Sequence, residues 1–266
     1  MLLAGAAGFW RPVRMRFAVE FSYDSGLVAV SIAIAILGSF TGLVVTTGIR
    51  HVKGPEVILR VILGGLGVGG GVWSMHFISM LAVILPVPLS YDLAETALSA
   101  VLAVIFTAIA FAIVGRNTFG KHTLLVSALF LGAGIAVMHY LGMYAVRGNC
   151  IVTYSWLGVF ISVAIAIEAS AVALWFAFRE RGMIDTLLGA VALGLAIASM
   201  HYSGMEATRF QPAQTASEFL QGSVSKAHLA IAISFTIYSV CGLCIFVFAF
   251  RTFGQRAITP ARVRLS

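Results

Sequence analysis

Charge is scarce in this chain of 266 residues, and its scarcity excludes a water-soluble globular protein. Only 10% of the residues are Asp, Glu, Lys or Arg, whereas about 25% is usual in soluble domains. Hydrophobic residues make up 60% of the chain, and the mean hydropathy is +1.01. This composition indicates a protein that crosses a membrane several times.

Cysteine is also scarce, and three residues of it do not make a disulfide framework. Cys150 stands alone, and we expect Cys241 and Cys244 to be small packing side chains in an apolar run. A nucleophile beside a base is missing too, and the glycine-rich run 64–71 lacks the lysine of a phosphate-binding loop. We therefore expect no enzymatic activity, and nothing in the chain favours binding to nucleic acid.

Long apolar stretches dominate what remains, and each can cross the bilayer core as a helix of about 20 residues. Strands with open edges are excluded there, because lipid cannot satisfy their backbone groups. The sequence therefore predicts an all-α membrane protein with seven transmembrane helices. They are expected at residues 27–49, 56–84, 93–114, 123–146, 155–178, 184–208 and 227–250.

Basic residues predict the orientation of these helices. If the N-terminus lies outside, eleven of the 17 Lys and Arg residues lie on the inner side and the other six on the outer side. The positive-inside rule therefore places the N-terminus outside and the C-terminus inside. We divide the chain into an N-terminal segment (1–21), a membrane domain (22–250) and a basic cytoplasmic tail (251–266), which would also contact anionic membrane lipid.

One motif occurs three times: Met-His-aromatic, followed by a second Met four residues after the His. The three histidines are His76, His139 and His201, separated by 63 and 62 residues. Glycines precede them by seven residues, at Gly69, Gly132 and Gly194, which favours close packing of the second, fourth and sixth helices with one another.

The helices before the motifs repeat as well. Ser22–Asp24, Ser90–Asp92 and Thr153–Ser155 precede the first, third and fifth spans. The fold is therefore three two-helix repeats plus a seventh helix. Since a two-helix unit keeps its orientation in the membrane, all three histidines should lie at one depth, near the outer face.

Imidazole and thioether groups suit copper, especially Cu(I), better than Mg or Ca. A His and a Met four residues later share one helix face, whereas the Met before the His points about 100° away. The favoured metal ligands are therefore His76, Met80, His139, Met143, His201 and Met205. Met75, Met138 and Met200 are additional candidates.

Other groups near the motifs have two interpretations each. Asp24 and Asp92 are good helix N-caps, but a carboxylate could also fix the tautomer of a metal-bound histidine. Packing or core hydrogen bonds would explain one motif alone, but three copies at one depth favour ligands. Glu168 stands in the middle of the fifth span, where the repeat partner is Leu37. It is either an intramembrane relay or gating element, or a neutral acid bonded to a helix neighbour.

The motifs resemble those of the MHYT domain family of bacterial integral membrane sensors, over about residues 22–250. The resemblance implies seven spans and a copper site near the outer face that senses oxygen, carbon monoxide or nitric oxide. Phe77 departs from the family's tyrosine, so only Tyr140 and Tyr202 can offer a hydroxyl beside the ligands. Ile78, Leu141 and Ser203 replace its threonine. The matching segments are Trp73–Phe77, Leu85–Asp92, Met138–Met143 and Met200–Met205.

Members of that family are often joined to cyclase, phosphodiesterase or kinase domains, whereas this chain ends about 16 residues after its last span. We therefore expect a sensor in the bacterial inner membrane that signals through a separate partner. A copper transport or delivery protein is the alternative, and a haem protein with two histidine ligands is a second one. The sequence leaves open whether the motifs form one shared site or three.

Overall fold

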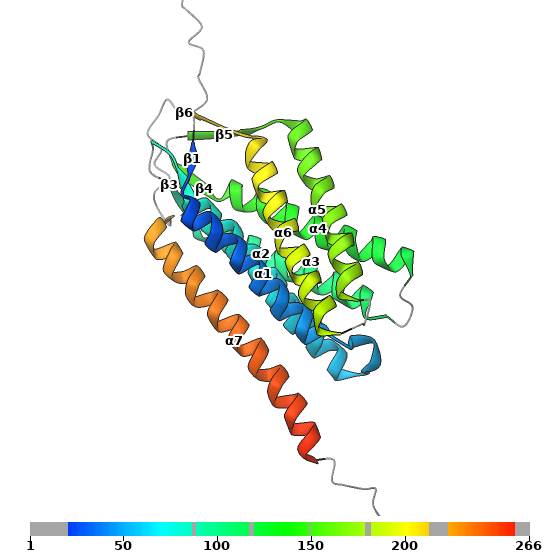
Figure 1. Cartoon of the computed structure of the whole chain (residues 1–266). Coiled ribbons are helices and arrows are strands. Elements are labelled where there is room, and N and C mark those ends of the chain that lie inside the picture. The colour runs from blue at the N-terminus through cyan, green and yellow to red at the C-terminus, as the bar shows by residue number, and fades with distance from the viewer. Residues whose placement is uncertain are drawn as a thin grey trace, which may run out of the picture.

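The computed structural model describes residues 21–86, 89–116, 120–148, 150–178, 182–212 and 223–258. Within them lie seven α-helices long and apolar enough to cross a membrane (Figure 1). They are α1 (Ser25–Thr46), α2 (Pro55–Ala82), α3 (Leu93–Val114), α4 (Lys121–Tyr144), α5 (Trp156–Ala177), α6 (Met183–Glu206) and α7 (Lys226–Ile258). The predicted spans are confirmed. The N-terminal segment lies outside the described residues up to residue 20, as does the end of the basic tail.

The first six helices form a closed ring with an approximate threefold repeat. Each two-helix unit packs within itself, and α2, α4 and α6 also pack against α3, α5 and α1 of the neighbouring units. Gly69, Gly132 and Gly194 lie where each even helix contacts the odd helix of the neighbouring unit. A Cβ on Gly132 would lie 2.7 Å from the Cα of Ile167 in α5. The even helices contact one another, as predicted. The prediction that these three glycines make those contacts is wrong, because each glycine packs against an odd helix instead.

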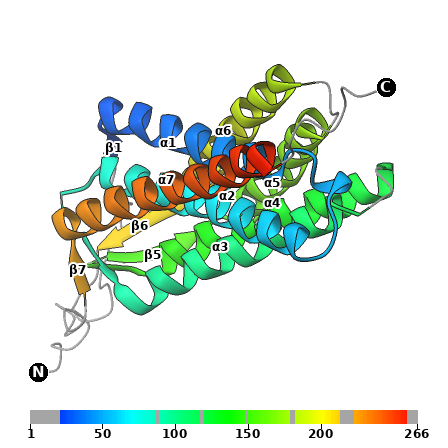
Figure 2. The ribbon, with the colours of Figure 1, turned by 90° about the horizontal axis from the view of Figure 1, so that it is seen from below.

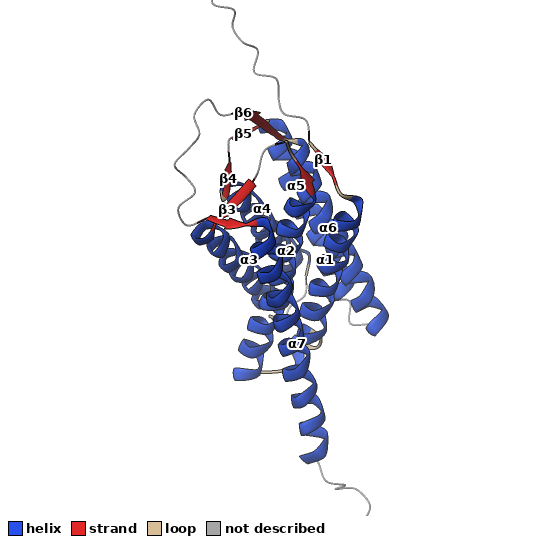
Figure 3. Cartoon of the chain, turned by 90° about the vertical axis from the view of Figure 1, so that its left-hand side faces the viewer, coloured by secondary structure: helices blue, strands red, loops and turns tan. Residues whose placement is uncertain are grey.

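Short strands, which the sequence did not predict, join the helices at one end of the bundle, here called the strand end (Figure 3). They pair as β1 (Ser22–Tyr23) with β2 (Val83–Ile84), β3 (Leu89–Asp92) with β4 (Val146–Gly148) and β7 (Ser223–Ser225), and β5 (Cys150–Tyr154) with β6 (Thr208–Pro212). Each of the three sheets pairs the chain before an odd helix with the chain after an even one. Because the strands lie beyond the helices, their backbone groups need no partner within lipid.

The seventh helix lies outside the ring, along α2 and α1 (Figure 2). It buries one narrow stripe that includes Cys241 and Cys244, and the Cys244 thiol donates to the carbonyl of Leu63 at 3.5 Å. Both cysteines therefore pack against the ring, as expected. The 33 residues of α7 extend about 50 Å. The helix is thus longer than a bilayer core and continues past residue 250, where the sequence predicted its end.

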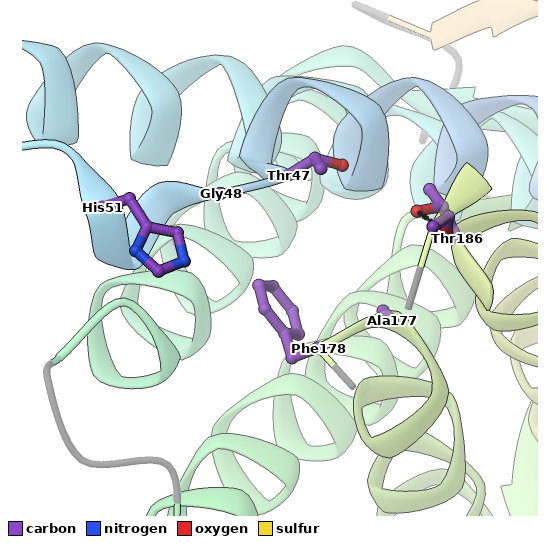
Figure 4. Close-up of a pocket in the computed structure, with 7 residues that line it drawn as sticks. Thr47, Gly48, His51, Ala177, Phe178 and Thr186 are labelled. Atoms are coloured by element: carbon purple, nitrogen blue, oxygen red, sulfur yellow. Dashed lines mark hydrogen bonds between the residues drawn. The ribbon is translucent and has the colours of Figure 1, made fainter. Parts of the chain in front are cut away.

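A cavity of about 270 Å³ opens at the end opposite the strands, between the α1–α2 connection and the α5–α6 connection (Figure 4). Its lining includes Thr47, His51, Phe178 and Thr186, and Arg50 donates to the carbonyl of Phe178 at 2.9 Å. The three motif histidines belong to the other half of the bundle, so this cavity is separate from them.

Candidate metal centre

The three motif histidines converge on one point in the ring. Their Nδ1 atoms lie 3.1 Å apart between His76 and His201, and 3.2 Å apart in each pair that includes His139. All three side chains are buried, with 1–2% of their surface exposed. They come from α2, α4 and α6, five or six residues before each helix ends. The three motifs therefore form one cluster, with one imidazole from each repeat, and not three separate ones.

The size of this triangle fits a metal ion. Histidine nitrogens bind first-row metals at about 2.0–2.1 Å, and three Nδ1 atoms that lie 3.1–3.2 Å apart can all reach one ion at that distance. His76, His139 and His201 would hold such an ion with three lone pairs, whereas closed structural sites use four protein ligands. Among the described His, Cys, Asp and Glu residues, these three form the one group that could hold an ion.

Hydrogen bonding alone does not account for the convergence. A neutral imidazole carries one N–H and one lone pair. If one Nδ1 carries the proton, the other two still direct lone pairs at each other across 3.1–3.2 Å. The three Nε2 atoms are buried and have no hydrogen-bond acceptor among the described residues. A cation bound by all three lone pairs would remove the repulsion between them.

Glycines of the neighbouring even helix make room for two of the rings. A Cβ on Gly204 would lie 2.5 Å from Nε2 of His139, and a Cβ on Gly142 would overlap Nε2 of His76. Both glycines lie three residues after a motif histidine, where the first repeat has Ser79 instead. Glycine therefore allows each ring to lie directly against the next helix.

Aromatic rings cover the histidines toward the strand end. Phe77, Tyr140 and Tyr202 each contact the preceding histidine edge to face, with ring centroids 4.8–5.0 Å apart. The Tyr140 hydroxyl bonds to Ser162 at 2.7 Å, and that of Tyr202 lies 3.2–3.3 Å from the hydroxyls of Ser79 and Ser31. None of these bonds reaches a histidine nitrogen.

A second layer of tyrosines lies above the first. Tyr23, Tyr91 and Tyr154 make T-shaped contacts, at 5.5–5.7 Å, with Tyr202, Phe77 and Tyr140 in turn. Burial raises the pKa of Tyr154 to about 12, with a smaller contribution from neighbouring Tyr140. Burial also raises the pKa of Tyr23 and Tyr91. The phenols are thus held neutral, and two layers of rings separate the histidines from the strand end.

All six motif methionines are buried, with at most 1% of each exposed. Within the described part of the chain, one polar contact reaches their sulfur atoms, from the Ser79 hydroxyl to Met75 Sδ at 3.8 Å. The six thioether groups are thus buried in the three helices that carry the histidines, and their role as ligands stays a prediction.

The two aspartates act as helix caps. Asp24 accepts the N–H of Leu27 at 2.9 Å, and Asp92 accepts that of Glu95 at 3.0 Å. Across the described residues, no hydrogen bond joins either carboxylate to a motif histidine. Capping is confirmed, and the second Asp92 oxygen lies 3.7 Å from the Arg147 guanidinium. The alternative that these carboxylates fix a histidine tautomer stays a prediction.

Glu168 lies on the outer surface of α5, with an exposed side chain. Its repeat equivalents, Leu37 and Ile105, are also exposed, at 38% and 45%. No hydrogen bond or ion pair of Glu168 is present among the described residues. The position gives no support to a relay to the histidines or to a bond with a helix neighbour, because the fifth helix turns this residue outward.

Sequence reasoning missed the residues that shape the histidine cluster without belonging to it. Gly142, Gly204 and Ser79 share one position after the motif histidine, and Ser31 and Ser162 share one position in the odd helices. The repeat alignment contains both signals. The role of each residue depends on which neighbouring helix its position faces, and the helical period alone does not identify that neighbour.

Comparison with known proteins agrees with this architecture. The family described as "Bacterial signalling protein N terminal repeat", MHYT, matches residues 15–57, 69–127, 132–190 and 194–264. MucR of Pseudomonas aeruginosa, a bifunctional diguanylate cyclase/cyclic di-GMP phosphodiesterase, is 43% identical over 71% of this chain and 28% of its own length.

Two further relatives match over more of the chain. The signalling protein YkoW of Bacillus subtilis is 30% identical over 86% of the chain, and the cyclic di-GMP phosphodiesterase NbdA of P. aeruginosa is 32% identical over 84%. The chain spans 29% of each, and no solved structure matches it. Three motif repeats, seven helices and these matches together show that the chain belongs to the MHYT family of membrane-embedded bacterial signalling domains.

Proposed function

We propose that His76, His139 and His201 together bind one copper ion, and that the domain senses a diatomic gas or redox state through it. The triangle of Nδ1 atoms, with sides of 3.1–3.2 Å, carries this proposal. Bound copper would supply a one-electron redox couple and a position for a small ligand such as oxygen, carbon monoxide or nitric oxide. The buried thioethers nearby favour copper over harder ions.

The residues around the histidines serve this role by orienting the imidazoles and excluding water. Gly142 and Gly204 let two rings rest against neighbouring helices, so that their positions report helix separation. The aromatic layers close the site toward the strand end. With the N-terminus outside, this end faces the outer side of the bacterial inner membrane, where a dissolved gas can reach it through lipid.

The output would pass through α7. The Lys226 ammonium at the start of α7 donates to the carbonyl of Val83 at 3.0 Å, and Val83 follows the helix that carries His76. Farther from the strand end, Val240 of α7 lies beside Gly70 of α2, and a Cβ built on Gly70 would be 3.8 Å from the Val240 side chain. A shift of α2 is therefore transmitted to α7 at both levels. The names of MucR and NbdA favour cyclic di-GMP turnover as the output, in a partner or further region that supplies the enzyme.

Two other interpretations fit less well. Copper transport needs ligands at several depths, whereas Glu168 faces outward and Cys244 bonds to α2. A haem iron with two axial histidines holds their nitrogens about 4 Å apart, on opposite sides of the macrocycle. The observed 3.1–3.2 Å leaves no room for that arrangement.

Elemental analysis of the purified protein tests the proposal. After anaerobic loading with Cu(I) and removal of loose metal, the wild type should retain about one copper per chain, since the three histidines form one ligand set. A His76→Ala/His139→Ala/His201→Ala variant should retain none, and His122→Ala, a histidine at the start of α4, should match the wild type. Metal-free wild type, or a triple variant that still binds copper, would refute the proposal.

A further inference from the structure

The three edges between the even helices differ in one residue. Where α2 meets α4, and where α4 meets α6, a histidine ring lies against a glycine, Gly142 or Gly204. The third edge, between α6 and α2, has Ser79 at the equivalent place. A Cβ at either glycine would collide with the ring. Ser79 carries a Cβ, so the His201 ring cannot lie as close to the α2 backbone as the other two rings lie to α4 and α6.

Hydroxyl groups hold this third edge instead. Tyr202 of α6 lies 3.2 Å from the Ser79 hydroxyl of α2 and 3.3 Å from the Ser31 hydroxyl of α1. These are long for bonds between hydroxyls, whose usual length is about 2.7–2.8 Å. Tyr140 of α4 makes the bond equivalent to that between Tyr202 and Ser31. Its hydroxyl lies 2.7 Å from the hydroxyl of Ser162 in α5. The Tyr202 hydroxyl of α6 is therefore held by longer bonds than the Tyr140 hydroxyl of α4.

The hydroxyls of Ser79, Tyr202 and Ser31 each carry one proton, and this fixes which of them donates each hydrogen bond. Ser31 donates its only hydroxyl proton to the carbonyl of Val28 at 2.7 Å. Tyr202 must then donate to Ser31, and Ser79 must donate to Tyr202. If Ser79 turns its proton to Met75 Sδ, 3.8 Å away, the link between α2 and α6 is lost. The edge thus has two alternative hydrogen-bonding states.

We propose that the α2–α6 edge is the one that opens during signalling, that His201 is the exchangeable histidine, and that Ser79 is the positioning residue responsible. The part that concerns the ion rests on the proposed function above. Gly142 keeps His76 of α2 against α4, and Gly204 keeps His139 of α4 against α6. The contacts of α4 with both neighbours therefore persist while α6 and His201 move away from α2. The opening edge borders α1 and α2, the two helices against which α7 packs.

Hydrogen exchange of the metal-free protein in detergent tests the opening directly. Amides of residues 200–206 in α6 should exchange about fivefold faster than those of 138–144 in α4, the ratio expected from the loss of one net hydrogen bond. Ser79→Gly should remove this difference by allowing close seating. Tyr202→Phe should increase it, whereas Tyr140→Phe, the matched control, should leave exchange in α6 unchanged. Ser79→Ala, which keeps the Cβ and loses the hydroxyl, should behave like Tyr202→Phe.

The same variants loaded with Cu(I) test the role of His201. Transfer of the ion to bathocuproine disulfonate should be about fivefold slower in Ser79→Gly and about fivefold faster in Tyr202→Phe than in the wild type. Gly242→Ala in α7, where the new Cβ meets nothing within 4 Å, should leave it unchanged. Equal exchange in α4 and α6, or identical exchange of α6 in Tyr202→Phe and Tyr140→Phe, overturns the inference. A wild type that binds no copper overturns the proposed function, while the exchange comparison still decides whether this edge opens.

Discussion

Replacing Gly204 with alanine should detach His139 from the site. The new Cβ would lie 2.5 Å from Nε2 and 3.0 Å from Cδ2 of that ring, whereas ordinary contacts begin near 3.4 Å. The ring must therefore retreat by about 1 Å, several times the roughly 0.2 Å tolerance of a metal–ligand distance. We expect the affinity for Cu(I) to fall about 10–100-fold, the range seen when residues that orient ligands are changed.

The assay is competition with a Cu(I) chelator, together with thermal unfolding in detergent. Overpacking should cost about 1–3 kcal/mol of stability, so the folded fraction is measured beside the affinity. Gly242→Ala in α7, where nothing lies within 4 Å of the new Cβ, is the matched control and should change neither affinity nor fold. In a His139→Ala background, Gly204→Ala should have no further effect on affinity. Wild-type affinity in a folded Gly204→Ala protein would refute the proposed seating.

Three further changes distinguish the roles of neighbouring residues. Glu168→Leu should leave copper content unchanged and stability equal or higher, because the carboxyl faces outward; lost copper would restore the relay hypothesis. Asp92→Ala should cost about 1 kcal/mol as a lost cap and leave copper affinity unchanged, measured by thermal unfolding and chelator competition. The folded-state pKa of Tyr154, near 12, lies above the usual value of about 10, so its stabilisation should be lost as pH rises from 10 to 12. Tyr154→Phe should flatten that part of a pH–stability profile, and an unchanged slope would contradict the assignment.

The arrangement of the helices was predictable because lipid imposes strong constraints. Runs of about 20 apolar residues have few alternatives to a membrane-spanning helix, and an even-span repeat requires the three histidines to share one depth. The extension of α7 beyond residue 250 was missed, since the change from apolar to basic residues marks the membrane boundary and leaves the helix end undetermined. The strands were missed because segments such as Ser22–Tyr23 are too short to show a period of two.

The histidine cluster was predictable in its residues but not in its geometry. Repetition identified His76, His139 and His201, while convergence on one point depends on the rotation of each helix about its axis. That rotation is set by contacts such as Gly132 against Ile167, which pair residues far apart in the chain. Glu168 shows the limit of the rule that buried charge marks function, because its place in the sequence could not reveal which side of α5 it occupies.

If one ion is bound as proposed, a site with one ligand from each repeat would measure the relative positions of three helices, because no repeat would bind the ion alone. If the α2–α4, α4–α6 and α6–α2 contacts were identical, each would open equally readily. No single helix would then transmit the signal. The departures from the repeat break this equivalence. Phe77 and Ser79 distinguish α2 from α4 and α6, and α7 packs along α2 and α1. Because these differences fall on one side of the ring, a change at the shared site can become a movement of α7 in one direction.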